Sequence, residues 1–229
     1  MRHVIVGSGP AGVVAAETLR KNQQDADITL VNNEDAPPYS RMALPYFLID
    51  QIKENGTYLR KKEGYFRDKG IDIVDGEVSR IDLDKRSLSI VNANVDSIEY
   101  DKLLLATGSS PNIPKIDGIE LEGVRSCWTL SDARYILRNI KKGDDVVLMG
   151  AGFIGCIILE SLVKSGANLT VIEMEGRMVP RMMNDDAGGM IKEWCEKKGV
   201  SIKTDTRVDE NIKMDDGRLS RLLSTKKSL

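Results

Sequence analysis

The sequence contains few of the residues on which most catalytic and metal sites depend. Of its 229 residues one is histidine and three are cysteines, Cys127, Cys156 and Cys195. An odd number of cysteines without C-x-x-C spacing supports neither a disulfide framework nor a zinc site. A single histidine also leaves little material for a catalytic triad or a histidine-based metal centre. The composition therefore argues against these kinds of chemistry.

The sequence also lacks a charge imbalance and a long apolar segment. Its 33 basic and 35 acidic residues give a net charge of −2, so there is no electrostatic reason to expect nucleic acid or an anionic membrane as a partner. No segment approaches the length that spans a bilayer, and the N-terminus has the pattern of a strand rather than of a cleavable leader. We expect a cytoplasmic protein with one large or two small domains.

A glycine motif follows directly on the first apolar segment. Residues 3–6 are compatible with a strand, residues 7–12 read G-S-G-P-A-G, and a helix-compatible segment follows. A strand, this turn and a helix in succession predict a dinucleotide-binding unit, because the glycines allow a tight turn and close approach of a pyrophosphate to the helix N-terminus. The candidate contact residues are Gly7, Gly9, Pro10, Ala11 and Gly12.

The second strand of such a unit usually ends in an acidic residue that accepts hydrogen bonds from a ribose. Here residues 28–31 are predicted to form that strand. The expected position of the acid, about twenty residues beyond the glycines, falls on Asn33, and Glu34 is next. Both residues stay open as the ribose contact.

The same pattern recurs in the second half of the chain. Residues 145–149 lead into a second glycine motif, whose candidate contact residues are Gly150, Gly152, Phe153, Ile154 and Gly155. The next apolar segment ends at Glu173, which can accept from a ribose 2′-OH but would repel a 2′-phosphate. We therefore expect NAD(H) rather than NADP(H), while the nearby Arg177 could soften this preference.

Residues 36–47 follow the second predicted strand. Their sequence is A-P-P-Y-S-R-M-A-L-P-Y-F, which combines three prolines with several apolar and aromatic residues. With the first glycine motif, this segment resembles the FAD-dependent pyridine nucleotide-disulfide oxidoreductase superfamily. The resemblance is to the group that includes NADH oxidases, rubredoxin reductases and nitrite reductase flavin domains. It covers residues 1–208.

The resemblance implies an α/β fold with two Rossmann-like, three-layer domains on parallel sheets, which bind FAD and NAD(P). It places Arg41 beside the FAD and the backbone of Val78 against the adenine. It also implies that Ala106, Thr107 and Gly108 lie near the flavin, where the chain crosses between domains. Since Pro111 and Pro114 follow, we expect an FAD-binding domain over residues 1–113 and an NAD(P)-binding domain over residues 114–229.

One residue departs from the family's thiol chemistry. Members that reduce peroxides or disulfides have a redox cysteine where this chain has Met42, and a thioether cannot form a thiolate. The three cysteines elsewhere are interpreted as packing residues.

Two expectations concern helices. Residues 56–70 are predicted to form one polar helix that ends at Lys69-Gly70, and Ser131 is predicted to cap the helix over residues 130–137.

Two dinucleotide sites predict an enzyme in which a hydride passes from NADH to FAD and then to an electron acceptor that the sequence does not identify. The two cofactors carry the difficult chemistry, so no catalytic side chain is required. In the family the sequence continues into a second part of the FAD domain and a dimerisation domain, and no matching motif follows Val208. The alternatives are a non-catalytic FAD- and NAD-binding subunit, or a half-enzyme that a second polypeptide completes. Whether the chain forms oligomers is also left open.

Overall fold

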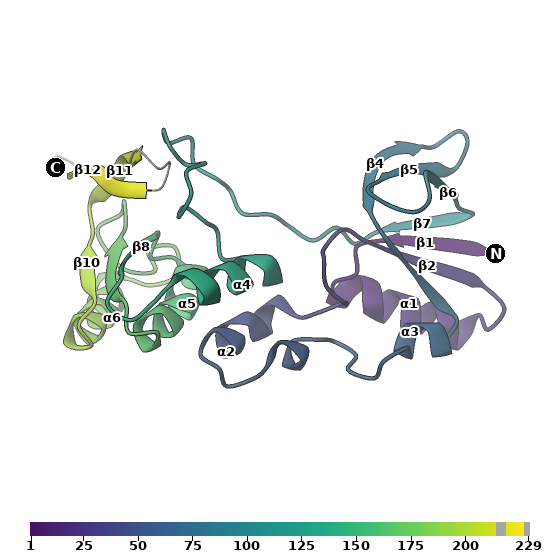
Figure 1. Ribbon diagram of the computed structural model, residues 1–229, viewed down its shortest axis with the longest axis horizontal. Coiled ribbons are helices and arrows are strands. Elements are labelled where there is room, and N and C mark those ends of the chain that lie inside the picture. The colour runs from purple at the N-terminus through teal and green to yellow at the C-terminus, as the bar shows by residue number, and fades with distance from the viewer. Residues whose placement is uncertain (214–218, 227–229) are drawn as a thin grey trace. The chain divides into compact units, whose positions relative to one another are not determined.

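The computed structural model describes residues 1–213 and 219–226 (Figure 1). The chain divides into two compact units. The first contains Met1–Leu44 and Ile52–Ser110, and the second contains Pro45–Gln51 and Pro111–Leu229. Each unit has its own parallel sheet with helices packed on it, which confirms the predicted α/β class with parallel sheets.

The parallel sheet of the first unit has four strands in the order β3-β2-β1-β7. Their bounds are Arg2–Val6 for β1, Asp27–Asn32 for β2, Ile71–Asp75 for β3 and Lys102–Leu105 for β7. Side chains on successive strand residues point to opposite faces. Ile5 and Leu30 accordingly pack with Ala16 of helix α1 (Pro10–Asn22), whereas Val4 and Val31 belong to a separate core cluster.

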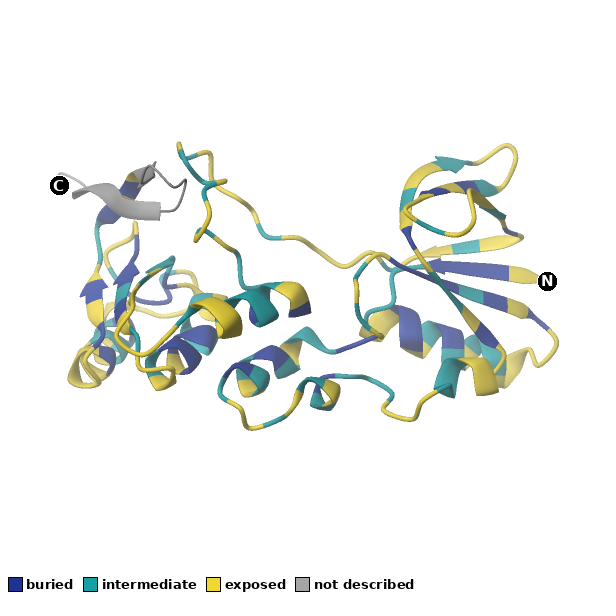
Figure 2. Ribbon diagram, viewed as in Figure 1, coloured by how far each residue is buried: buried dark blue, intermediate teal, exposed yellow. Residues whose placement is uncertain are grey.

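That second cluster lies under a small antiparallel sheet. Strands β4 (Glu77–Asp82), β5 (Ser87–Val91) and β6 (Ser97–Glu99) pair in this order, and Leu88 and Ile90 of β5 pack with Val4 and Val31. The first unit therefore has three layers: helix α1, the parallel sheet and the antiparallel sheet. Figure 2 shows β1 and β2 mainly as buried residues between the outer layers.

The prediction of one helix over residues 56–70 is wrong. The structure has a 3₁₀ turn, η2 (Glu54–Gly56), and a short helix, α3 (Tyr65–Asp68), with no helix over residues 57–64. Gly64 has a φ of 69°, a left-handed conformation that does not continue a right-handed helix. Long-range contacts also hold this segment, since Tyr58 forms an isolated bridge with Tyr39 and the Arg60 guanidinium donates to Glu17.

The second unit has a three-stranded parallel sheet in the order β10-β9-β8. Its bounds are Asp145–Met149 for β8, Asn168–Ile172 for β9 and Ser201–Lys203 for β10. The helices are α2 (Leu44–Leu48, of which residues 45–48 belong to this unit), α4 (Leu130–Asn139), α5 (Phe153–Lys164) and α6 (Asp185–Lys197). An antiparallel pair, β11 (Thr206–Lys213) and β12 (Leu219–Lys226), follows β10.

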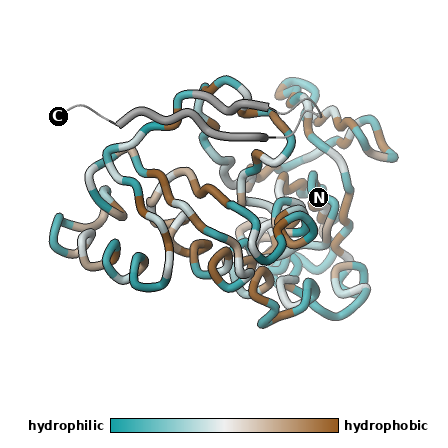
Figure 3. The backbone as a smooth tube through the Cα atoms, turned by 60° about the vertical axis from the view of Figure 1, so that its left-hand side comes forward, coloured by the Kyte–Doolittle hydropathy of each residue, from teal (hydrophilic) through white to brown (hydrophobic). Residues whose placement is uncertain are grey.

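The core of the second unit is formed where α5 and α6 meet the sheet. Leu159 and Leu162 of α5 and Cys195 of α6 pack with Leu169 and Val171 of β9. Hydrophobic residues concentrate in the strands and helices, while the outlying loops are mainly hydrophilic (Figure 3).

The predicted cap of helix α4 is also corrected. Thr129, not Ser131, is the N-cap, because its hydroxyl accepts from the Asp132 N–H at 3.1 Å and the Asp132 carboxylate accepts from the Thr129 N–H at 2.9 Å. This reciprocal pair is a capping box, which satisfies two backbone donors at once. Among the described residues, no helix is both long and apolar enough to cross a membrane.

Candidate functional site

The first glycine loop is folded tightly against its own unit. Gly7 follows β1 with a φ of 109°, and its N–H donates to the Val31 carbonyl at 2.9 Å. A Cβ at Gly7 would lie 2.2 Å from the Ala106 carbonyl oxygen, and a Cβ at Gly12 would lie 1.9 Å from the Gly7 carbonyl oxygen. Any other residue at these two positions would collide with backbone. The loop therefore requires glycine at its first and third motif positions for its own packing.

Gly9, the middle glycine, has a different surrounding. A Cβ there would meet no atom within 4 Å, although Gly9 is the N-cap of α1 and Pro10 is the first helical residue. Packing within the protein therefore does not require glycine at this position. The open backbone at a helix N-terminus fits the approach of a pyrophosphate, so these residues fit an adenine dinucleotide such as FAD.

The end of β2 carries the polar groups nearest this loop. Asn32 is buried, Asn33 is exposed, and Glu34 is half-buried. The Glu34 carboxylate accepts from Arg41 at 2.8 Å through one oxygen and from the Tyr39 hydroxyl through the other. Burial by itself would lower the pKa of Arg41, but hydrogen bonding to Glu34 and Tyr39 raises it above its usual value.

The remaining predicted residues of the first unit lie around the same loop. The Ala106 N–H donates to the Val6 carbonyl at 2.8 Å, which places residues 106–108 beside Gly7. A second Arg41 nitrogen donates to the Ser109 carbonyl at 3.2 Å. Val78 is half-buried on β4, two residues after Gly76, whose N–H donates to the Asn32 carbonyl at 2.8 Å. The structure thus brings the predicted glycines, Glu34, Arg41 and the Ala-Thr-Gly segment together.

The second glycine loop repeats this geometry except at its first glycine, because a Cβ at Gly150 would meet no atom within 4 Å, although its φ is 96°. The Gly150 N–H donates to the Ile172 carbonyl at 2.8 Å, and a Cβ at Gly155 would lie 2.3 Å from the Gly150 carbonyl oxygen. A Cβ at the middle glycine, Gly152, would meet no atom within 4 Å. Phe153 and Ile154, the first residues of α5, are 55% and 48% exposed. This loop also fits a dinucleotide, on the same grounds.

Glu173 lies at the end of β9 as expected and is 8% exposed. One carboxylate oxygen accepts from the Ala151 N–H at 2.7 Å, and the other accepts from the Glu175 N–H at 2.9 Å. The Val179 N–H donates to the Ala151 carbonyl at 2.8 Å. The strand end, the glycine loop and the segment after β9 are therefore tied together at Ala151.

Arg177 supports the segment that leads into α6. Its guanidinium donates to the carbonyls of Met183 at 2.8 Å and Pro180 at 3.0 Å, and it pairs with Asp185 at 2.9 Å. These bonds commit Arg177 to residues 180–185.

The few residues that could support other chemistry have structural roles. The single histidine, His3, is buried and bonds the Gln23 side chain at 2.8 Å. Burial is the main cause that raises the pKa of all three cysteines, in the case of Cys127 to about 11. Met42 is 69% exposed. No group of residues in the described part of the chain could hold a metal ion.

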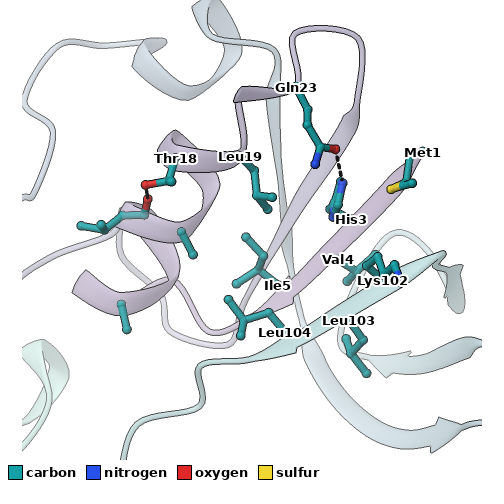
Figure 4. A pocket seen from close by; sticks show the side chains of 13 residues that line it. Met1, His3, Val4, Ile5, Thr18, Leu19, Gln23, Lys102, Leu103 and Leu104 are labelled. Carbon is teal, nitrogen blue, oxygen red and sulfur yellow. Dashed lines mark hydrogen bonds between the residues drawn. The ribbon is translucent and has the colours of Figure 1, made fainter. Parts of the chain in front are cut away.

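The first unit also contains a cavity next to the start of α1. It has a volume of about 740 Å³ and lies between α1, β1 and β7 (Figure 4). Leu19, Ile5 and Leu104, one from each element, lie around it, as does Ala11 at the start of α1. We name this cavity the β7 groove.

Two α/β units in series, each with a glycine loop between the first strand and helix of its parallel sheet, define a Rossmann-like dinucleotide-binding class. Within this class, the family description "pyridine nucleotide-disulphide oxidoreductase" matches residues 1–229. The chain belongs to this family.

Individual relatives agree with this membership. An NADH oxidase from Methanocaldococcus jannaschii is 35% identical over 209 residues, which cover 88% of this chain and 46% of the relative. Subunit epsilon of the NADH-dependent phenylglyoxylate dehydrogenase from Aromatoleum evansii is 30% identical over 207 residues, with 90% and 49% covered. The solved structure of an NAD-dependent persulfide reductase from A. fulgidus has a TM-score of 0.89 and 32% identity, covering 99% of this chain and 43% of that one. The chain spans about half the length of these relatives.

Proposed function

We propose that this chain is an FAD-dependent NAD(P)H oxidoreductase, in which a hydride passes from NADH to the flavin and then to an electron acceptor. The observation that carries the proposal is the repeated loop geometry. In both units the third glycine packs on the carbonyl of the first, and the middle glycine faces open space at a helix N-terminus. Two cradles of one kind suit the two dinucleotides of this family.

We assign residues 1–113 to FAD and residues 114–229 to NAD(H). At the first site Gly7, Gly9, Pro10, Ala11 and Gly12 form the pyrophosphate cradle. Since Asn33 is exposed and Glu34 is paired with Arg41 beside the loop, Glu34 is the better candidate for the ribose contact. Val78 and residues 106–108 complete this site.

At the second site Gly150, Gly152, Phe153, Ile154 and Gly155 form the cradle, and Glu173 favours NADH over NADPH. Arg177 is held by its neighbours, one of which is acidic, so it offers little to a 2′-phosphate. We also place the protein in the cytoplasm, because its three cysteines are free thiols, as expected in a reducing compartment.

This function requires no catalytic side chain from the protein. When bound, FAD would supply the hydride-accepting chemistry, and the chain's own residues bind and orient the two dinucleotides. Orientation alone can contribute about 7–11 kcal/mol to lowering a barrier between two bound reactants. The absence of an acid–base pair from the predicted site residues is therefore no objection.

The visible absorption spectrum tests the proposal. The purified protein, incubated with FAD and desalted, should show flavin absorption, which NADH should bleach under anaerobic conditions. NADPH should bleach it more slowly at equal concentration. Absence of flavin absorption, or absorption that NADH leaves unchanged, contradicts the proposal.

A second candidate is a subunit or half-enzyme that another polypeptide completes, and the exposed edge of the first sheet favours it. In the described residues β7 pairs only with β1, and Leu104 and Leu105 on it are 42% and 56% exposed. Turnover with an artificial dye as acceptor supports the enzyme, whereas binding of FAD and NADH without turnover supports the subunit.

A further inference from the structure

The two glycine loops identify which residues are equivalent between the units. The first glycine donates to the last apolar residue of the next strand in both, Gly7 to Val31 and Gly150 to Ile172. The residue after that acceptor therefore occupies the same place in each unit. These residues are Asn32 and Glu173, so the structural equivalent of the acid at the second site is Asn32 and not Asn33.

Asn32 has surroundings that suit only an amide. It is 4% exposed, and its oxygen accepts from the Ser8 hydroxyl of the glycine loop at 2.7 Å and from the Glu34 N–H at 3.4 Å. Its nitrogen faces three acceptors: the carbonyls of Glu34 at 2.8 Å and Ala36 at 3.2 Å, and the Asp75 carboxylate at 2.8 Å. One side chain thus joins the glycine loop, the turn that carries Glu34 and the end of β3.

The surroundings of Glu173 differ at one of its two oxygens. One of its oxygens accepts from the Glu175 N–H two residues on, as the Asn32 oxygen accepts from the Glu34 N–H, but its other oxygen faces a donor, the Ala151 N–H of the glycine loop. The two strand ends therefore have the same architecture and differ in hydrogen-bonding polarity at one of the two side-chain atoms. A carboxylate fits the donors at the second site, and an amide fits the acceptors at the first.

We propose that Asn32 is a positioning residue for the first dinucleotide, which holds the glycine loop and Glu34 in place through an amide that an ionised carboxylate cannot replace. The proposal rests on the assignment of FAD to this loop. It predicts that Asn32→Asp, which introduces the acid usual at this place, weakens FAD binding. On the side of the present amide nitrogen, an ionised carboxylate would face two carbonyls and a second carboxylate and would find no donor there.

FAD affinity of the apoprotein, measured by flavin fluorescence, gives the first test. Asn32→Asp should raise the Kd for FAD about tenfold or more. The matched control is Asn94→Asp, which makes the same change at an exposed position of the first unit and should leave the Kd for FAD unchanged. In the double variant Asn32→Asp/Asp75→Asn, the amide at position 75 can donate to the carboxylate at position 32. This variant should therefore recover part of the lost FAD affinity. Tighter or unchanged FAD binding by Asn32→Asp overturns the proposal.

The pH dependence of the apoprotein's melting temperature gives a second test that needs no FAD. The acceptors around an aspartate at position 32 should raise its pKa above the unfolded value of about 3.9. A protonated carboxyl can donate like the amide, so Asn32→Asp should melt close to the wild type below about pH 4. Its deficit should grow as the pH rises through the folded pKa and then stay constant. A deficit that does not vary with pH overturns the proposal.

The two tests separate the inference from the proposed function. If the wild type binds no FAD, the assignment of the first loop fails, while the melting experiment still decides the role of Asn32. If the wild type binds FAD and Asn32→Asp binds it equally well, only the positioning role fails. Should Asn32→Asp fail to fold at neutral pH, recovery with Asp75→Asn or at low pH supports the mechanism, and no recovery in either contradicts it.

Discussion

At the scale of single residues, Glu17 on α1 and Arg60 form an ion pair that several hydrogen bonds support. The Glu17 carboxylate accepts two bonds from the guanidinium, at 2.7 and 2.6 Å, and a third from the Tyr65 hydroxyl at 3.0 Å. The bond from Arg60 is the main cause that lowers the pKa of Glu17, against the opposing effect of burial. The pair ties α1 to a segment without helical structure.

Low pH should therefore reduce the stability of the first unit, because protonation of Glu17 removes its ion pair with Arg60. Because the folded pKa is lowered, the contribution is complete above the unfolded pKa of about 4.3 and is lost as the pH falls through the folded pKa. Glu17→Gln should lower the free energy of unfolding by about 1–2 kcal/mol at pH 7 and by much less near pH 3. Urea denaturation at both pH values measures this, and an equal loss at both would contradict the assignment.

The cysteines should be poor nucleophiles in the folded protein. With a pKa of about 11, only a fraction on the order of 10⁻⁴ of Cys127 is thiolate at pH 7. Burial likewise raises the pKa of Cys156 and Cys195. A disulfide reagent should label the native protein slowly and all three thiols rapidly in denaturant. Rapid labelling of one thiol in the native state would revive a thiol relay, which Met42 argues against.

Prediction from sequence was good at the scale of residue types and less good at individual positions. The glycines were recognisable because close packing permits no other residue at Gly12 or Gly155. The role of Asn32 could not be recognised from the sequence, because spacing along a chain does not show which residue at the end of a strand points inward. Val179 gave no signal at all. It has a φ of 49°, a conformation that β-branched residues rarely adopt, and only its hydrogen bond to Ala151 reveals that it lies against the second glycine loop.

At the scale of elements, strands and helices with a strong apolar period were predicted closely. The expected strand over residues 28–31 is β2 (Asp27–Asn32), and the expected helix over residues 130–137 is α4 (Leu130–Asn139). The structure of residues 56–70 was not predicted, because their composition is compatible with a helix. Gly64 and the long-range Arg60–Glu17 ion pair instead hold this segment in a mainly non-helical conformation. A polar segment has no hydrophobic periodicity, so its sequence does not indicate which distant residues it contacts.

The two kinds of glycine within each loop should separate stability from binding. Gly12→Ala places a Cβ against the Gly7 carbonyl and should lower the free energy of unfolding by about 2–3 kcal/mol. Gly9→Ala meets no protein atom, so it should cost less than about 1 kcal/mol and instead weaken FAD binding. Thermal denaturation and flavin titration of both variants measure the two effects.

The second loop supplies the matched control for this pair. Gly155→Ala should reduce stability and Gly152→Ala should weaken NADH binding, while Gly152→Ala leaves FAD binding unchanged. If Gly9→Ala and Gly152→Ala affect the same ligand, the assignment of one dinucleotide to each loop is wrong.

At the scale of the whole molecule, the sequence predicted two successive units, each with a glycine loop and a parallel sheet. It could not predict that residues 45–51 group with the second unit. This grouping depends on contacts such as the hydrogen bond of 3.2 Å from the Ser161 hydroxyl to the Pro45 carbonyl, 116 residues apart. Pairings over such distances follow from the fold and leave no local pattern.

The edge strand β7 of the first parallel sheet predicts self-association of the chain. Exposed edge strands with apolar side chains promote association, and β7 presents Leu104 and Leu105 beside the β7 groove. We expect the isolated chain to self-associate as its concentration rises, and Leu105→Lys to reduce this. Because Leu105 is 56% exposed, the variant should change the free energy of unfolding by less than about 0.5 kcal/mol.

Light scattering over a concentration series measures this association. Leu83→Lys is the control, since Leu83 is 76% exposed just after β4, outside β7 and the residues that line the groove. Association that Leu105→Lys leaves unchanged would rule out this edge as its cause. If a second polypeptide completes the chain through β7, Leu105→Lys should weaken that complex as well, whereas Leu83→Lys should not, so one pair of variants examines both uses of the same surface.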